Sequence, residues 1–177
     1  MMGVPTFYTR LLADPAFTDR QAAAVRLFIS GSAPLLPDTF EAFRARTGKI
    51  ILERYGMSEA GMIASNPLQG ERRAGTVGFP LPGISVRIVD DRDQALPAGE
   101  IGAIQVLGDN VFAGYWRQPD KTREEFTADG YFRTGDIGLV DRDGYVAIVG
   151  RAKDLIITGG YNVYPREIEL AIDALPG

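Results

Sequence analysis

Two short apolar runs, residues 26–30 and 50–53, lie on either side of a helical pattern that opens at Pro37 and ends at Gly48. Proline suits the first turn of a helix, and glycine suits the left-handed backbone that follows its last turn. Another short helix is expected over residues 4–12. A strand–helix–strand order of this kind predicts an α/β layer that contains a parallel pair of strands.

The pattern changes near Gly75, beyond which short apolar segments alternate with turns. Strands are expected at residues 84–89, 101–107, 138–140 and 145–149, with turns at 90–93 and 141–144 and a short helix at 119–126. Closely spaced strands of this type favour a small antiparallel barrel or a curled sheet. The expected fold class is therefore an α/β portion followed by mostly antiparallel β-structure.

The last residues form a third pattern after Gly150. A brief strand at 156–157 is followed by a helix from Pro165, which places one apolar stripe at helical spacing: Ile168, Ala171, Ile172 and Leu175. Because nothing in the sequence follows this stripe to cover it, we expect the 177 residues to be a piece of a longer chain.

The composition narrows the possible functions. Hydrophobic residues make up 45% and charged residues 24%, which is typical of a globular domain, and the net charge of −4 argues against nucleic acid as the main partner. No apolar run approaches the ~20 residues of a membrane span. The absence of cysteine and histidine excludes disulfides, histidine-ligated zinc and a Ser-His-Asp triad within this chain. Cytoplasmic residence is expected, whereas the oligomeric state is not predicted.

Residues 53–61 (Glu-Arg-Tyr-Gly-Met-Ser-Glu-Ala-Gly) combine an aromatic ring, two glycines, a hydroxyl and a carboxylate. An ATP site needs such groups, for adenine, close backbone approach, phosphate and Mg²⁺. Taken alone, this string also fits an ordinary segment in which a strand ends and a loop begins. Three further strings accompany it: residues 131–136 (Tyr-Phe-Arg-Thr-Gly-Asp), 150–154 (Gly-Arg-Ala-Lys-Asp) and 159–162 (Gly-Gly-Tyr-Asn).

Together the four strings resemble the adenylate-forming superfamily of acyl-CoA synthetases, firefly luciferase and peptide-synthetase adenylation domains. The resemblance implies part of the large domain of such an enzyme, an α/β layer plus a small distorted β-barrel. It divides the chain into an α/β portion (1–75), a β-barrel subdomain (76–149), and a hinge with the start of the C-terminal domain (150–177).

The resemblance also implies roles for individual residues in binding ATP or AMP. Tyr55 would stack on adenine, Asp136 would accept both ribose hydroxyls, and Arg151 would reach the ribose and phosphate. The remaining implied nucleotide-binding residues are Ser32, Ala33, Pro34, Glu53, Arg54, Gly56 and Met57. Without the resemblance, Tyr55 is better interpreted as a core tyrosine at a strand end, and Asp136 also fits a residue that caps the following hairpin strand.

Four further roles concern phosphate, metal, the domain hinge and coenzyme A. Ser58, where the family has threonine, would meet the α-phosphate, and Glu59 would hold Mg²⁺. These two and Arg151 are the expected catalytic residues. Lys153 would be the hinge about which the small domain swings. The loop at Gly159 and Gly160 would line the pantetheine tunnel of CoA.

The acid is indicated by strings that resemble malonyl-CoA synthetases: residues 4–10, 53–57 and 66–83. A dicarboxylate needs a cation for its second carboxylate, and the candidate pair for this group is Arg10 with Ser30. A fatty-acid enzyme would instead need an apolar tunnel. Malonate and methylmalonate are not separated, because one methyl group gives only ~1–3 kcal/mol of discrimination.

Three features that the family carries are not found in these residues: a phosphate loop rich in glycine, serine and threonine, a preceding histidine, and a catalytic lysine near the end of the small domain. We therefore expect the 177 residues alone not to adenylate an acid. Two alternatives stay open. One is an adenylating enzyme for another acid or acceptor, such as a fatty acid, a carrier protein or oxygen. The other is a non-catalytic AMP-binding module.

Overall fold

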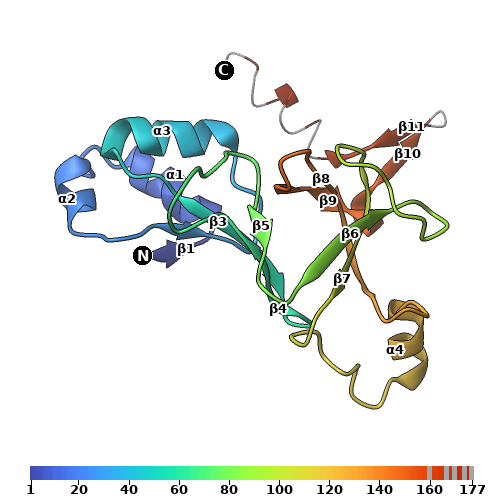
Figure 1. Cartoon of the computed structure of the whole chain (residues 1–177). Helices are drawn as coiled ribbons and strands as arrows, with labels where there is room; N and C mark the ends of the chain where they lie inside the picture. Colours follow the sequence, from blue (N-terminus) through green and yellow to red (C-terminus); the bar gives the residue numbers. More distant parts are fainter. Residues whose placement is uncertain (159–160, 166–167, 169–170, 173–174, 176–177) are drawn as a thin grey trace.

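The structure, a computed structural model of the chain, describes residues 1–158, 161–165, 168, 171–172 and 175 (Figure 1). Its helices are α1 (Pro5–Ala13), α2 (Asp19–Ala23), α3 (Pro37–Thr47) and α4 (Pro119–Glu125), with a 3-10 turn, η1, at Ala152–Asp154. Its strands are β1 (Met2–Gly3), β2 (Ile29–Ser30), β3 (Leu52–Met57), β4 (Gly61–Ser65), β5 (Phe79–Pro80), β6 (Ser85–Val89), β7 (Gly102–Leu107), β8 (Phe132–Val140), β9 (Val146–Arg151), β10 (Ile156–Thr158) and β11 (Tyr161–Val163).

The first sheet has the strand order β1-β2-β3-β4-β5. Strands β1, β2 and β3 are parallel, with Ser30 opposite Glu53, whereas β4 and β5 join in antiparallel pairing. The predicted parallel pair is thus confirmed. The helix between its strands is also confirmed: Pro37 begins α3, and Gly48 follows it with a left-handed φ of 67° and donates its N–H to the Arg44 carbonyl.

Helices α1, α2 and α3 lie together beside this sheet (Figure 1). Their core is aromatic: the ring of Phe43 packs edge-on against Tyr8 and Phe28, at centroid distances of 5.3 and 4.9 Å. Helix α2 was not predicted. It begins at a capping box in which the Gln21 N–H bonds to the Thr18 side chain and the Thr18 N–H bonds to the Gln21 side chain, and the Arg20 N–H also bonds to the Thr18 hydroxyl.

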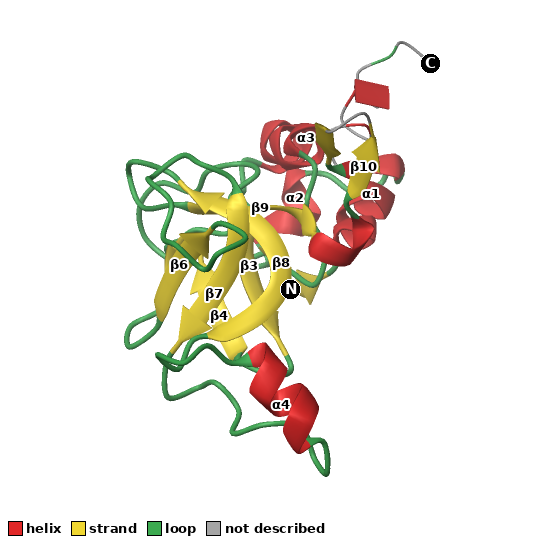
Figure 2. Cartoon of the chain, turned by 90° about the vertical axis from the view of Figure 1, so that its right-hand side faces the viewer, coloured by secondary structure: helices red, strands yellow, loops and turns green. Residues whose placement is uncertain are grey.

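The second sheet is antiparallel with the order β6-β7-β8-β9. This confirms the predicted antiparallel half, including the hairpin turn at residues 141–144, where the Asp141 N–H bonds to the Tyr145 carbonyl. Strand β8 curves strongly along its length (Figure 2). The expected short helix at 119–126 is α4. Residues 77–78 pair with Val146 and so connect the two sheets through their backbones.

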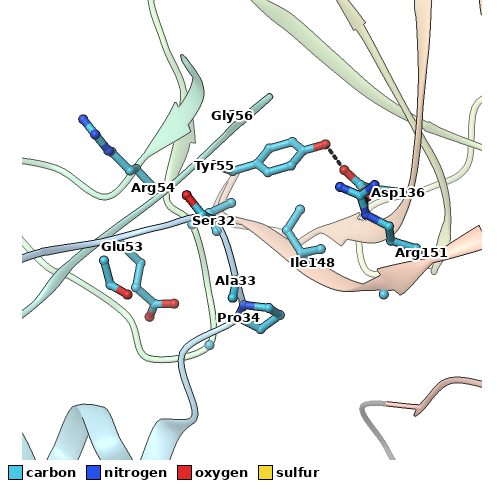
Figure 3. A pocket seen from close by; sticks show the side chains of 14 residues that line it. Ser32, Ala33, Pro34, Glu53, Arg54, Tyr55, Gly56, Asp136, Ile148 and Arg151 are labelled. Atoms are coloured by element: carbon cyan, nitrogen blue, oxygen red, sulfur yellow. Dashed lines mark hydrogen bonds and ion pairs between the residues drawn. The ribbon is translucent and has the colours of Figure 1, made fainter. Parts of the chain in front are cut away.

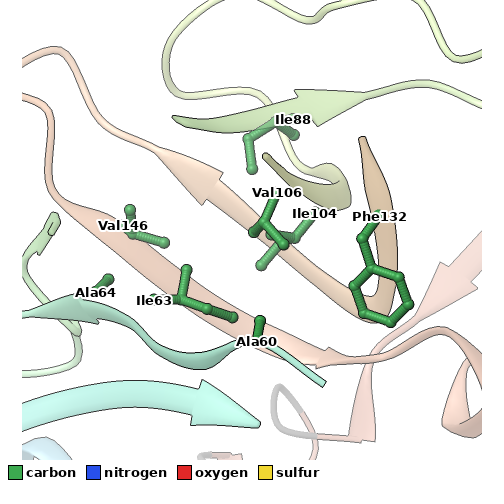
Figure 4. Packing of buried hydrophobic residues seen from close by; sticks show 8 residues of the cluster. All are labelled: Ala60, Ile63, Ala64, Ile88, Ile104, Val106, Phe132 and Val146. Carbon is green, nitrogen blue, oxygen red and sulfur yellow. The ribbon is translucent and has the colours of Figure 1, made fainter. Parts of the chain in front are cut away.

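A second core lies between the β3–β4 hairpin and the antiparallel sheet (Figure 4). Ala60, Ile63 and Ala64 of the hairpin region pack there with residues of all four later strands: Ile88, Ile104, Val106, Phe132 and Val146. Side chains from both sides of residue 75 share this core, so the hairpin is held against the second sheet. The division into units 1–75, 76–149 and 150–177 stays a prediction.

The strand in the second apolar run, residues 50–53, extends further than that run. Strand β3 begins at Leu52 and continues to Met57, and after a turn at residues 58–60 the chain returns as β4. The reason is antiparallel pairing: Tyr55 lies opposite Ala64, and the register shifts by a bulge between Tyr55 and Gly56. The signature string is therefore a β-hairpin.

The predicted strand at 156–157 is confirmed as part of β10. The helix expected from Pro165 falls largely on residues 166–167, 169–170, 173–174 and 176–177, which lie outside the described residues. Among the residues that the structure describes, no helix has the length and apolarity to cross a membrane.

Candidate functional site

A cavity of about 150 Å³ lies where the first sheet meets the end of β9 (Figure 3). Its lining comes from the two sheets and their connections: Ser30, Ser32, Ala33, Pro34, Glu53, Arg54, Tyr55, Gly56, Gly75, Val77, Asp136, Ile148, Gly150 and Arg151. Most of the predicted nucleotide-binding residues are in this set, although they come from three distant parts of the chain. The fold therefore gathers them around one hollow.

Tyr55, Asp136 and Arg151 form one side of the cavity. The Tyr55 hydroxyl donates a hydrogen bond of 2.5 Å to Oδ2 of Asp136, and Nε of Arg151 pairs with Oδ1 of the same carboxylate at 3.1 Å. Asp136 and Arg151 face each other as register partners on β8 and β9. Figure 3 shows the tyrosine ring reaching across toward this pair. One carboxylate thus ties β3 to the antiparallel sheet.

The electrostatics of this group follow from its burial. Burial, followed by the charge of Asp136, raises the pKa of Tyr55 well above its ordinary value of 10.0, so the phenol stays protonated and donates. Burial also raises the pKa of Asp136 above 3.8, although the Tyr55 hydrogen bond and the charge of Arg151 oppose that rise. Asp136 is only 3% exposed. Each of its oxygens has a second acceptor position, which leaves capacity for two hydroxyl donors of a ligand.

Several small residues also line the cavity. Ser32, Ala33 and Pro34 follow β2, and Ser32 has a left-handed φ of 66°. Gly56 is required by the hairpin itself, since an added Cβ would lie 2.3 Å from the Gly61 carbonyl oxygen on β4. Small side chains here leave backbone groups accessible to a ligand.

Ser30 supplies a buried hydroxyl at the cavity. The residue is 1% exposed, and its Oγ has no hydrogen-bond partner among the residues that the structure describes. Glu53, its register partner on β3, is 5% exposed and lines the same cavity. A buried hydroxyl without a partner is costly to keep, so its presence beside a cavity is consistent with a ligand that bonds to it.

A second, more open hollow of about 780 Å³ adjoins the first. It shares Ser32, Arg54, Gly56 and Arg151 with the cavity and adds Met57, Ser58 and Glu59 from the hairpin turn. Ser58 is exposed and Glu59 half-buried. The predicted phosphate- and metal-binding residues therefore lie in a hollow continuous with the predicted adenosine site, as a nucleotide with its phosphates would require.

Among the predicted residues that the structure describes, Arg10 and Lys153 are in neither lining. Arg10 is exposed on α1, two residues after the buried Tyr8 and hence on the opposite face of the helix, so the structure does not bring it to Ser30. Lys153 lies exposed in η1, directly after β9. Gly159 and Gly160 lie outside the described residues. The roles assigned to all four stay predictions.

Other cavity residues were not anticipated. Val77 and Ile148 line the cavity from the connection between the sheets and from β9. In the sequence they belong to alternating apolar segments like those of any sheet, so no local signal marks them. Tyr115 was missed too: its hydroxyl donates to Oε1 of Glu59 at 3.2 Å from the loop before α4.

Comparisons with known proteins give one consistent result. Residues 1–116 match the AMP-binding enzyme family. The crystal structure of ATP-bound MatB from Rhodopseudomonas palustris is 59% identical with a TM-score of 0.97, covering 99% of this chain and 35% of that chain. Malonate–CoA ligase of Arabidopsis thaliana is 45% identical, over 94% of this chain and 28% of its own length. Sulfoacetate–CoA ligase of Cupriavidus necator is 47% identical, over 98% and 34%.

The chain thus spans about a third of the length of these relatives. These relatives support the resemblance drawn from the four sequence strings. The family match covers the first sheet and the start of the second. The match, the fold and the residues gathered at the cavity agree: the chain belongs to the family of AMP-binding enzymes.

Proposed function

We propose that the protein containing this chain is an ATP-dependent acid–thiol ligase for a small acid with a second anionic group, malonate or methylmalonate in the first instance. In the first step a carboxylate oxygen attacks the α-phosphorus of ATP, giving acyl-AMP and pyrophosphate. In the second step the CoA sulfur replaces AMP, giving acyl-CoA. The observation that carries the proposal is the Tyr55–Asp136–Arg151 group at the cavity.

That group suits a nucleoside. The Asp136 carboxylate is already oriented by two donors and keeps acceptor capacity for the ribose hydroxyls. Holding the carboxylate before the ligand arrives lowers the entropy lost on binding. The Tyr55 ring offers an apolar face for adenine, and the side chains of Ser32, Ala33 and Pro34 are small enough to border a flat base.

The hairpin turn suits phosphate and Mg²⁺. Mg²⁺ in nucleotide sites is bound by one or two carboxylates together with phosphate oxygens and water. Glu59 supplies one carboxylate and Ser58 one hydroxyl in the adjoining hollow. The described residues contain no group of three or more acidic, histidine or cysteine side chains that would form a complete protein cage. The donor set therefore fits a magnesium ion shared with a nucleotide, which would supply charge stabilisation for the departing pyrophosphate.

The acid is proposed from two supports. Relatives are named for malonate and for sulfoacetate, both of which carry a second anionic group. Ser30 adds a buried hydroxyl at the cavity that has no hydrogen-bond partner among the described residues. Arg10 with Ser30 is our proposed pair for the distal anion, Lys153 the proposed hinge, and Gly159 with Gly160 the proposed passage for pantetheine. Cytoplasmic residence remains part of this proposal.

The test is pyrophosphate release by the full-length protein with ATP, Mg²⁺ and CoA. The acids are malonate, methylmalonate, sulfoacetate, acetate, octanoate and benzoate. Activity confined to the acids with two anionic groups supports the proposal. Activity on octanoate or acetate alone would keep the adenylation chemistry and overturn the choice of acid, and activity that needs a carrier protein in place of CoA would overturn the acceptor.

The role of Arg10 has its own test. Replacing Arg10 by Ala is expected to raise the KM for malonate far more than the KM for ATP. Arg20→Ala, which removes another exposed arginine on the neighbouring α2, is the matched control and is expected to leave both KM values unchanged. Equal effects of Arg10→Ala on both substrates would remove Arg10 from the acid site.

A further inference from the structure

The loop between β7 and α4, residues 108–118, is bonded to the hairpin turn that carries Ser58 and Glu59 (Figure 1). The Phe112 N–H donates to the Glu59 carbonyl at 2.7 Å. The Asn110 side-chain amide donates to the carbonyls of Ala60, in the turn, and of Met62, on the returning strand. The backbone of the turn is thus fixed from the second sheet rather than by the hairpin alone.

One side-chain contact in this loop reaches the Glu59 carboxylate. The Tyr115 hydroxyl donates to Oε1 of Glu59 at 3.2 Å, and both residues are half-buried. The phenol is the donor in this bond, because an ionised carboxylate can only accept. Because one oxygen of Glu59 is held, the direction of the carboxylate is set.

Tyr115 is itself held from several sides. Its N–H bonds to the Thr122 hydroxyl on α4 at 2.9 Å, its ring packs edge-on against Phe112 at 4.8 Å, and the Lys121 ammonium lies 4.2 Å from the ring centroid. Gly114 packs so closely on α4 that an added Cβ would lie 2.6 Å from a methyl carbon of Thr122. The hydroxyl therefore projects from a rigid support.

We propose that Tyr115 is a positioning residue that orients the Glu59 carboxylate toward a nucleotide-bound divalent cation. The inference rests on the proposed function, since it needs Glu59 to be the magnesium ligand. Partners that hydrogen-bond to a metal-binding carboxylate fix its orientation, and their loss typically weakens metal affinity on the order of 10- to 100-fold.

Tyr115→Phe in the full-length protein tests this role, because it removes the hydroxyl and keeps the ring contacts with Phe112 and Lys121. Calorimetry would measure the Kd of ATP with Mg²⁺ and the Kd of AMP in EDTA. We expect Mg²⁺-dependent ATP binding to weaken on the order of tenfold, while AMP binding without metal stays unchanged. Tyr131→Phe is the matched control: it removes a hydroxyl bonded to Ser85 outside the site and is expected to change neither Kd.

A double-mutant cycle separates positioning from a general effect on the fold. If Tyr115 acts through Glu59, then Tyr115→Phe added to Glu59→Gln causes no further loss of MgATP affinity. A further loss in the double variant, or equal weakening of AMP and MgATP binding by Tyr115→Phe, would overturn the positioning role. Failure of the unmodified protein to bind either nucleotide would overturn the proposed function and this role with it.

Discussion

The hydroxyl of Tyr55 donates to the carboxylate of Asp136 although 81 residues separate the two positions in the chain. The bond joins β3 of the mixed sheet to β8 of the antiparallel sheet, and Arg151 completes it from β9. The contact thus has two consequences: it fixes the relative position of the two sheets, and it orients a buried carboxylate at the cavity.

Tyr55→Phe is expected to destabilise the protein by roughly 1.5–3 kcal/mol, because it removes a donor to a charged acceptor that remains buried. Tyr145→Phe is the matched control. Its hydroxyl donates to a neutral acceptor, the Glu71 carbonyl, at 3.0 Å, so its loss is expected to cost about 1 kcal/mol. Urea unfolding of the two variants makes the comparison. An equal or smaller loss for Tyr55→Phe would mean that water replaces the tyrosine as donor.

Asp136→Asn is expected to alter how stability depends on pH. The folded-state pKa of Asp136 is raised above 3.8, so the folded protein binds more protons than the unfolded chain between 3.8 and that raised value. Across this window, the wild-type free energy of unfolding should fall relative to that of Asp136→Asn as pH rises. Other carboxylates titrate in both proteins and cancel in the difference. Unfolding measurements of both proteins from pH 4 to pH 8 supply this difference. A wild-type free energy of unfolding that rises with pH relative to that of Asp136→Asn would contradict the raised pKa of Asp136.

At neutral pH, the same substitution should lower the affinity for a nucleotide without lowering the stability of the fold. An amide keeps one acceptor oxygen but loses the charge and half of the acceptor capacity. The Asp136→Asn variant is therefore expected to bind AMP more weakly. Its free energy of unfolding should nevertheless be at least that of variants with other neutral substitutions in β8. Calorimetry with AMP checks this, and unchanged affinity would remove Asp136 from the ribose site.

Gly56→Ala is expected to destabilise the hairpin. The new Cβ would lie 2.3 Å from the Gly61 carbonyl oxygen, so the strands must separate, and overpacking of this kind typically costs about 1–3 kcal/mol. Gly150→Ala is the control, because no atom lies within 4 Å of its added Cβ. Thermal unfolding of both variants should show a lower midpoint for Gly56→Ala alone. Similar midpoints would indicate that the bulge relaxes to accept the methyl group.

Ser30→Ala is expected to leave stability unchanged or to raise it, since the substitution removes a buried hydroxyl that has no partner in the described chain. Thr47→Val provides the contrast. Its hydroxyl is buried but donates to the Phe43 carbonyl at 2.7 Å, so its removal should cost about 1 kcal/mol. If Ser30→Ala also weakens binding of the acid, the hydroxyl serves the ligand. A clear loss of stability would point instead to a structural partner for Ser30.

Several local features were predictable from sequence because short-range chemistry decides them. Pro37 and Gly48 mark the ends of α3, and the turn at 141–144 joins β8 to β9. The capping box from Thr18 to Gln21 was an available signal for the missed helix α2. Hydrophobic alternation likewise indicated the antiparallel strands after residue 75.

What local patterns did not reveal was the partner of each strand. Residues 53–57 contain strand-forming and turn-forming residues together, so only pairing with β4 decides that β3 continues through Tyr55 and Gly56. The cavity lining also depends on tertiary packing. Val77 and Ile148 are ordinary apolar residues in the sequence, and they line the cavity only because the two sheets pack together.

The sequence by itself determined the family, because its four motif strings place chemically distinctive residues in fixed local order. It also determined the α/β portion and the antiparallel portion, since hydrophobic periodicity follows from the geometry of each element. Only the tertiary structure decided that Tyr55 bonds to Asp136, that Ser30 is buried with no partner among the described residues, and that Tyr115 bonds to Glu59. These contacts join residues far apart in the chain, and they depend on strand pairing and on packing between sheets, which no local pattern specifies.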